Sequence, residues 1–302
     1  MTLGQLVDRF ESAERSIVVI NRTDPDPVQD MLVDTFGDDA VRVTDRRTIE
    51  RSGVGPNGFG DGGLDVGTLR GHDGVPFEGD RLADAEDLVL LLDGDDEVLA
   101  GSTLEALGDA ILFVNSDLYI TGTRAPEALE LPPVITGLDD TVFTLRGYPE
   151  SNRQKLLLIT ISRFIERVAL AAGGGTLRSS FQRLSRLEDE LGTRRVYERV
   201  AAGGIDAHLY GVPDDPPTGL EATVHGGRSS DFTDGWFVVF EPPGGPAAVD
   251  AATDLDRGVN GGVGLLAVET EPRLWHGIWT FDPDRLGAIS RYIRRNLSTP
   301  AG

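Results

Sequence analysis

Residues 151–191 most constrain the fold of this chain, because helical periodicity there is interrupted by three glycines. Residues 173–175 are all glycine, which takes the positive φ that a helix C-cap requires. A second apolar pattern follows them, and Gly192 ends it. The sequence therefore predicts two helices joined by a glycine hinge. The apolar residues recur at three- and four-residue steps: Leu157, Ile161, Phe164, Ile165, Val168 and Ala172, then Leu177, Phe181, Leu184, Leu187 and Leu191.

The same region differs from the rest of the chain in charge. Residues 151–200 contain ten Lys and Arg and five Asp and Glu, whereas the whole chain has a net charge of −22. We therefore expect this region to form a contact face for a partner. Arg163 and Glu166, three residues apart, predict an ion pair on the helix surface, or a guanidinium presented to a partner's carboxylate or phosphate. The candidate face comprises Arg163, Glu166, Gln182, Arg183, Arg186, Arg194 and Arg195.

The overall composition excludes several classes of protein. The chain has 50 Asp and Glu, a single lysine (Lys155) and no cysteine, so disulfides and thiolate chemistry are excluded. Such acidity is typical of proteins from halophiles, whose surface carboxylates keep them soluble in concentrated salt; an acidic surface for a basic partner is the alternative. The net charge argues against nucleic-acid binding. Neither a secretory signal nor an apolar run long enough to cross a membrane is visible, so we expect a cytoplasmic protein.

The first half, residues 1–130, predicts an α/β arrangement. Strands are expected at residues 16–21 and 41–44, with a helix starting at Asp26 between them, which implies a parallel crossover. A hairpin is expected from 88–92 to 98–100. A helix capped by Ser102 and Glu105 should follow, and then two strands, or a strand and a turn, at 111–114 and 118–121. Residues 46–86 lack periodicity and predict a long loop, and residues 123–133 predict a linker.

The second half, residues 131–297, predicts a mixed sheet. Strands are expected at residues 141–145, 205–210, 235–241, 263–269 and 274–281, the last two antiparallel because their connection is short. Helices are expected at 193–202 and after Asp282, which has the cap and proline pattern of a helix start. The predicted fold class is α/β with α+β character in the second half. Each half should hold a mixed sheet, with the helical pair between them.

Aromatic residues of the second half form the only candidate ligand pocket. Residues alternate between the two faces of a strand, so Trp275, Trp279 and Phe281 should share one face. They either belong to the core or line a wall on which a planar ligand stacks. The histidines lack metal-site spacing, and the sequence predicts no catalytic or metal-binding residue and no particular cofactor. The candidate pocket residues are Trp236, Trp275, His276, Trp279 and Phe281.

Four segments resemble the DICT sensory domain, a family named for its occurrence with diguanylate cyclases and two-component systems. They are LITISRFIERVA (158–169), SFQRLSRL (180–187), GWFVVFE (235–241) and PRLWHGIWTFDPD (272–284). The resemblance is clearest over residues 131–297, and the first half is similar to the stand-alone version of halophilic archaea. It implies a non-enzymatic signal-input protein with partners such as histidine kinases, and it carries no catalytic residues to transfer. The alternatives are a small-molecule receptor with an aromatic pocket or a regulator of transcription that acts by contact.

Overall fold

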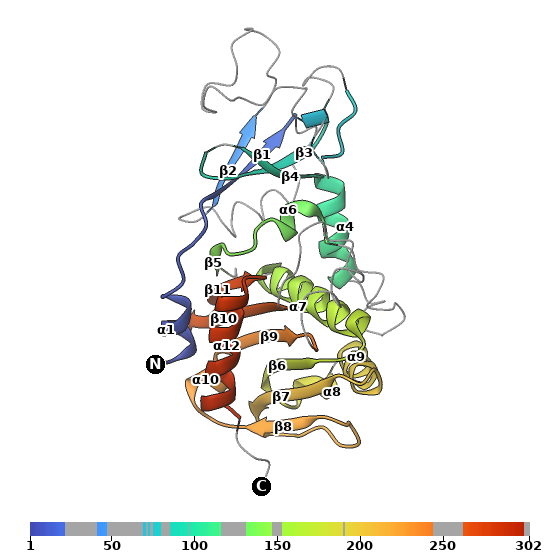
Figure 1. Cartoon of the computed structure of the whole chain (residues 1–302), viewed down its shortest axis with the longest axis vertical. Coiled ribbons are helices and arrows are strands. Elements are labelled where there is room, and N and C mark those ends of the chain that lie inside the picture. The colour runs from blue at the N-terminus through green and yellow to red at the C-terminus, as the bar shows by residue number, and fades with distance from the viewer. Residues whose placement is uncertain are drawn as a thin grey trace.

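The computed structural model describes residues 1–21, 41–46, 69–70, 72, 75–79, 85–95, 97–115, 131–146, 153–189, 191–243 and 262–298. These residues form two β-sheets, and the predicted α/β class with a mixed sheet in each half is confirmed. The four-stranded sheet and the seven-stranded sheet lie toward opposite ends of the long axis, and the N-terminus lies beside the larger sheet (Figure 1).

The four-stranded sheet has the order β2-β1-β3-β4. Its strands are β1 (Arg15–Ile20), β2 (Val41–Arg46), β3 (Leu88–Leu92) and β4 (Val98–Thr103). The predicted parallel pair β1–β2 and the hairpin β3–β4 are both confirmed. The helix expected from Asp26, most of the 46–86 loop and the strand expected at 118–121 lie outside the described residues.

Helix α4 (Leu104–Asn115) follows β4 directly. Its first turn is capped by Thr103, whose Oγ1 accepts from the backbone N–H of Ala106 at 3.0 Å, so the predicted cap at Ser102 was wrong by one residue. The strand predicted at 111–114 was also wrong, because the helix continues through those residues. Leu104 and Leu107, three residues apart, are both buried, which is the spacing of one helix face. The short apolar run that follows them continues the same helix.

The seven-stranded sheet has the order β5-β11-β10-β9-β6-β7-β8, with β6–β7 and β7–β8 parallel and its other pairs antiparallel. Helices α6 (Pro133–Thr136), α8 (Arg186–Asp189), α9 (Leu191–Ala202) and α10 (Ser230–Thr233) connect or flank it. The strands are β5 (Val142–Arg146), β6 (Thr176–Arg183), β7 (Asp206–Val212), β8 (Thr223–Gly226), β9 (Gly235–Glu241), β10 (Val263–Glu271) and β11 (Leu274–Thr280).

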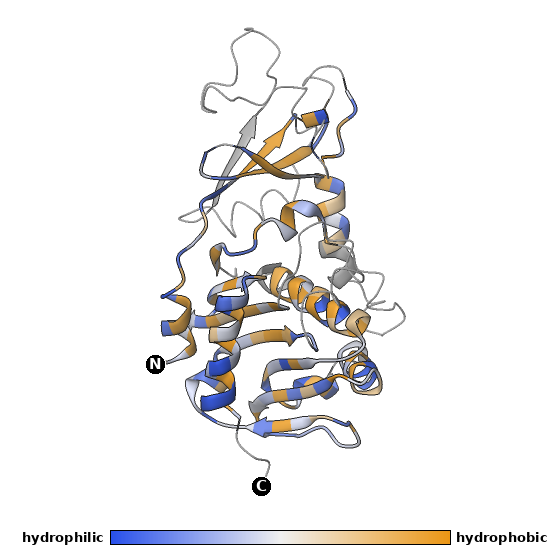
Figure 2. Cartoon of the chain, in the orientation of Figure 1, coloured by the Kyte–Doolittle hydropathy of each residue, from blue (hydrophilic) through white to orange (hydrophobic). Residues whose placement is uncertain are grey.

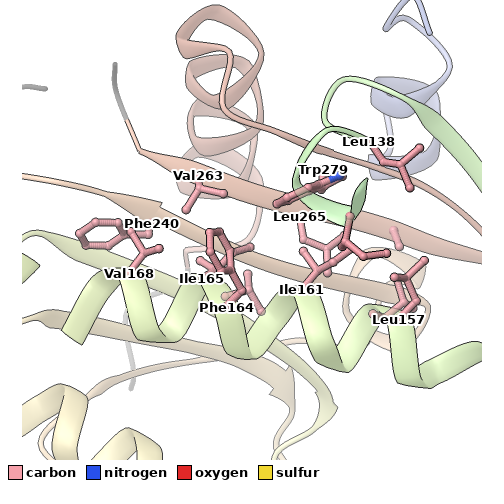
Figure 3. Close-up of a cluster of buried hydrophobic side chains, with 14 of the residues drawn as sticks. Leu138, Leu157, Ile161, Phe164, Ile165, Val168, Phe240, Val263, Leu265 and Trp279 are labelled. Atoms are coloured by element: carbon pink, nitrogen blue, oxygen red, sulfur yellow. The ribbon is translucent and has the colours of Figure 1, made fainter. Parts of the chain in front are cut away.

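Helix α7 (Arg153–Ala172) confirms the first predicted central helix and packs its apolar face on the sheet (Figure 3). Orange and blue positions alternate along it, as expected for a helix with one apolar face (Figure 2). It ends at the glycines, with Gly173 at φ +63° and Gly175 at φ +100°. Among the helices of the described ranges, none combines the length and apolar character needed to cross a membrane.

The second central helix was wrong. Residues 176–183 form strand β6, and only the short α8 follows it. Leu177 lies opposite Phe240 of β9 and Ala207 of β7, so the segment is an interior strand with backbone partners on both sides. Residues 177–180 are all buried. The apolar spacing fitted a helix, but pairing with two neighbouring strands decided the conformation.

Both faces of the larger sheet are covered. Helix α7 covers one face, where the buried cluster also includes Ile17 and Val89 of the smaller sheet. Helices α1 (Leu3–Val7) and α12 (Pro283–Asn296) cover the other. The predicted cap at Asp282 is present, and Thr2 with Gln5 forms a capping box at the start of α1. Strand β9 contributes alternate residues to the two cores, since Val238 and Phe240 face α7 while Phe237 and Val239 face α12.

Candidate functional site

The predicted pocket aromatics lie mainly in the core between α7 and the sheet. Trp275 and Trp279 are 0% and 1% exposed. Trp236 meets Trp275 edge to face at 5.7 Å between ring centroids. Phe164 of α7 meets Trp279 at 6.1 Å and Phe281 at 6.3 Å in the same manner. These contacts favour the interpretation that the tryptophans are core residues.

His276 lies on the opposite face of β11 from the tryptophans. Its Nε2 is 3.5 Å from Asp8 Oδ1, just after α1, and its Nδ1 is 3.4 Å from the Thr144 hydroxyl. The structure therefore does not bring His276 together with the rest of the predicted pocket. The cavity beside Trp279 has a volume of about 10 Å³, about the space for one water molecule and far below the roughly 300–1,000 Å³ typical of ligand sites. It is lined only by apolar side chains: Ile135, Leu138, Phe143, Leu157, Ile161 and Trp279.

The most unusual chemistry in the core is a buried ion pair within α7. Arg163 Nη1 lies 2.6 Å from Glu166 Oε2, and the two side chains are 7% and 3% exposed. The predicted pairing is therefore confirmed, but its predicted place on the helix surface was wrong. Neither residue forms part of an outer contact face, because α9 packs over this side of α7.

Helix α9 supplies further hydrogen bonds to the buried pair. Thr193 Oγ1 accepts from Arg163 Nη2 at 2.5 Å, and the Tyr197 hydroxyl donates to Glu166 Oε1 at 2.8 Å. Thr193 and Tyr197 are four residues apart, so they share one face of the helix. Burial and the neighbouring Glu166 carboxylate raise the pKa of Tyr197 well above its ordinary value, so its hydroxyl remains a donor.

A second polar contact joins α7 to the sheet one residue before the ion pair. Trp236 Nε1 of β9 donates to Ser162 Oγ at 3.0 Å, and Ser162 Oγ donates to the Leu158 carbonyl at 2.7 Å. We name these six residues the core network: Ser162, Arg163, Glu166, Thr193, Tyr197 and Trp236. The core network therefore connects α9, α7 and β9 through side-chain contacts.

Burying the charges of Arg163 and Glu166 in the core costs free energy. Removing two ions from water costs several kcal/mol each, and their attraction offsets this only with good geometry and further hydrogen bonds. Here both charged groups receive an additional bond from α9, so the position of α9 bears directly on how well the charges are stabilised. A change in the position of this helix would cost more than a comparable change over a purely apolar contact.

The remaining members of the predicted face are divided between buried and exposed positions. Gln182 is buried, at the bulge of β6 and with φ +58°, and its Oε1 accepts from Arg186 Nη1. Arg183, Arg186 and Arg195 are exposed, and Arg183 lies 3.7 Å from Asp214 Oδ2. Of the seven predicted residues, the arginines at these three positions are the exposed ones.

Arg194 is largely committed to contacts within the chain. It pairs with Glu188 and, at 2.9 Å, with Glu198, and its Nη2 donates to the Thr218 carbonyl at 2.9 Å. The hydrogen bonds to Glu188 and Glu198 raise the pKa of this guanidinium. Arg194 therefore ties the segment before β8 to α9.

Sequence reasoning missed several residues of these clusters. The four-residue spacing of Thr193 and Tyr197 was visible, but nothing local showed that their face meets a buried charge pair. His208 and His225 appeared scattered, yet the parallel pairing of β7 with β8 places their ring nitrogens 2.9 Å apart. Such meetings depend on strand order, which a single sequence does not display.

Comparisons with known proteins neither support nor contradict the resemblance to the DICT domain. Within the ranges that the structure describes, no three His, Asp or Glu side chains are grouped as a metal site would require. Searches against protein-family models, curated proteins and solved structures found no match for the chain.

Proposed function

We propose that this chain is a cytoplasmic, non-enzymatic signal-input protein that acts through protein–protein contact. The basic contact face consists of Arg183, Arg186 and Arg195, at the end of β6, the start of α8 and the outer side of α9. One observation carries the proposal: the helix that bears Arg195 outside also holds the buried ion pair inside, through Thr193 and Tyr197. The resemblance to the DICT domain supports the same class of function.

The core network gives a physical route from this face to the sheet. A partner that shifts α9 must stretch the bonds to Arg163 and Glu166, and the neighbouring Ser162 is bonded to Trp236 of β9. Packed cores tend to switch between discrete arrangements rather than deform smoothly. Partner binding at α9 would thus bias the arrangement of α7 on the sheet, and a change at the sheet would equally bias partner affinity.

The chemistry of the face suggests the kind of partner. Exposed guanidinium groups bind carboxylates through two parallel hydrogen bonds, so an acidic surface on a signalling protein such as a histidine kinase fits. If the acidic composition reflects a saline cytoplasm, the Debye length is about 3 Å at 1 M salt. Recognition would then depend on contact-range pairs rather than on long-range attraction.

The test is cross-linked capture of partners from a high-salt host lysate, followed by identification of what is bound. Bait carrying Arg183→Gln, Arg186→Gln and Arg195→Gln is compared with wild-type bait. The matched control changes three exposed arginines of α12 with the same loss of charge: Arg291→Gln, Arg294→Gln and Arg295→Gln.

We expect wild type and the α12 control to capture the same signalling protein, and the contact-face variant to lose it. An unchanged set of captured proteins from the contact-face variant would contradict the proposal. So would equal losses from both variants, since these would indicate a general effect of charge.

A further inference from the structure

Two histidines meet at the edge of the larger sheet. Strands β7 and β8 pair in parallel, with His208 opposite Thr223 and Tyr210 opposite His225. His208 and His225 therefore occupy the same face of the sheet, displaced by two positions along adjacent strands. His208 Nδ1 and His225 Nε2 are 2.9 Å apart.

The two rings lie end to end rather than face to face. Their centroids are 5.2 Å apart and their planes differ by only 6°. The centroid distance exceeds the nitrogen–nitrogen distance by about two ring radii, so both nitrogens lie on the line between the centroids. This is the geometry of an N–H···N hydrogen bond. A bridging zinc ion would need about 2.0–2.1 Å to each nitrogen along that line, which the gap does not allow.

A third side chain determines which nitrogen carries the proton. Asp206 Oδ2 lies 3.0 Å from His208 Nε2, and an ionised carboxylate can only accept. His208 therefore donates from Nε2, and its Nδ1 is the acceptor when the ring is neutral. His225 must then donate from Nε2. The donors run in one direction, from His225 to His208 to Asp206.

This chain of bonds limits how many protons the two histidines can take up while they stay hydrogen-bonded to each other, which we call the closed pair. One extra proton is accommodated, because His208 can hold hydrogens on both nitrogens while His225 moves its own to Nδ1 and accepts. A second extra proton would place two N–H hydrogens against each other across 2.9 Å. Separated histidines have no such limit and bind two extra protons in acid.

We propose that His208 and His225 form a proton-operated latch, which holds the edge strand β8 against β7 near neutral pH and releases it in acid. The latch acts on a short element: β8 has four residues, and β7 is its only strand neighbour in the described sheet. Tyr210 stacks on His225 at 4.5 Å, and its hydroxyl is bonded to Ser298 after α12. The closed latch therefore also holds Tyr210 in place, and through it Ser298 at the C-terminal end of α12.

The expected pH window follows from proton counting. Histidine is the side chain whose charge ordinarily changes between pH 5 and 8, so in acid the open state holds one more proton than the closed state. By linkage, the equilibrium constant for opening then rises about tenfold for each pH unit of acidification. The direction does not depend on where the first proton binds to the closed pair.

The charged groups around the pair do not supply an alternative switch in this range. Arg178 of β6 lies beside His208 in register, and its Nη1 is 3.2 Å from Glu241 of β9. Ser290 of α12 donates to the same Glu241 carboxylate at 2.7 Å. Of the groups facing the latch, only the histidines ordinarily titrate between pH 5 and 8. Arg228, two residues after β8, is an exposed cation.

The latch lies next to the basic contact face. The Thr218 carbonyl, in the segment that leads into β8, accepts from Arg194 of α9. Release of β8 would therefore move a segment that is bonded to α9. This link from pH to partner contact rests on the proposed function, whereas the latch itself does not.

The test is hydrogen exchange of the backbone amides of residues 223–226 at pH 7.5, 6 and 5, corrected for the intrinsic exchange rate. We expect protection to fall about tenfold between pH 6 and pH 5, while residues 263–269 of β10 keep theirs. His208→Gln supplies a donor and an acceptor but does not titrate, so it should remove the pH dependence. His276→Gln, on a different part of the sheet, should leave it intact.

A second measurement, on the wild-type protein, does not depend on how the variants fold. The nitrogen chemical shifts of both imidazoles, followed by NMR across the same pH range, should show one proton taken up by the two rings before release. Independent titration of the two rings would overturn the latch, and so would constant protection of β8 or the same acid response in His208→Gln. Neither readout involves a partner, so loss of the contact-face proposal would not affect this result.

Discussion

The buried ion pair of the core network offers the sharpest test of the energetics. Glu166→Gln removes the carboxylate charge with little change in shape and leaves the Arg163 guanidinium buried without its counter-ion. Breaking one partner of a buried pair typically costs 3–5 kcal/mol. The Tyr197 hydroxyl also loses a charged acceptor, a bond worth about 1.5–3 kcal/mol that overlaps with the first term. We therefore expect a loss of about 3–5 kcal/mol in the free energy of unfolding.

The reverse experiment replaces both charges together. Arg163→Met with Glu166→Leu removes both desolvation penalties and fills similar volume, but it also removes the bonds of the Thr193 and Tyr197 hydroxyls to the pair. The double variant should therefore lose about 1–3 kcal/mol, less than Glu166→Gln. Each single variant should be much less stable than the double. A double-mutant cycle then gives the coupling between the two residues directly.

Urea unfolding at a fixed, high salt concentration measures all of these values, with the midpoint and the m-value compared across variants. Glu198→Gln is the control, because Glu198 pairs with Arg194 at the surface four residues away and should cost less than about 0.5 kcal/mol. A loss of under 1 kcal/mol for Glu166→Gln would refute the reasoning, since it would mean that water reaches the pair.

Three further perturbations follow from the packing. Trp275→Ala should cost about 3–5 kcal/mol in urea unfolding, because the side chain is fully buried; a small loss of stability together with lost ligand binding would instead favour a pocket. Gly175→Ala should destabilise more than Gly173→Ala in the same assay, although both have positive φ, because the added methyl would lie 2.5 Å from the Glu241 carbonyl while Gly173 has open space. Burial and the hydrogen bond to Asp231 raise the pKa of Tyr292, so its contribution to stability is present below pH 10 and is lost as the pH rises above it. Tyr292→Phe should therefore flatten the plot of unfolding free energy against pH above pH 10. An unchanged plot would contradict this.

The sequence by itself determined the elements whose signals are local. The apolar stripe of α7, its glycine stop, the cap of α12 and the strands β9, β10 and β11 were all predicted correctly. In each case, periodicity and capping residues point to the same conformation that the tertiary contacts favour. The pairing of Arg163 with Glu166 was likewise visible, because residues three apart on a helix are neighbours.

Only the tertiary structure decided the features that depend on distant partners. Residues 176–183 became a strand because β7 and β9 offered backbone hydrogen bonds on both sides. The Arg163–Glu166 pair became buried because α9 covers it and supplies Thr193 and Tyr197. His208 and His225 meet because β7 and β8 are parallel neighbours, although 16 residues separate the two in the chain. Local periodicity reports which face of an element is apolar, but it does not say which element will cover that face.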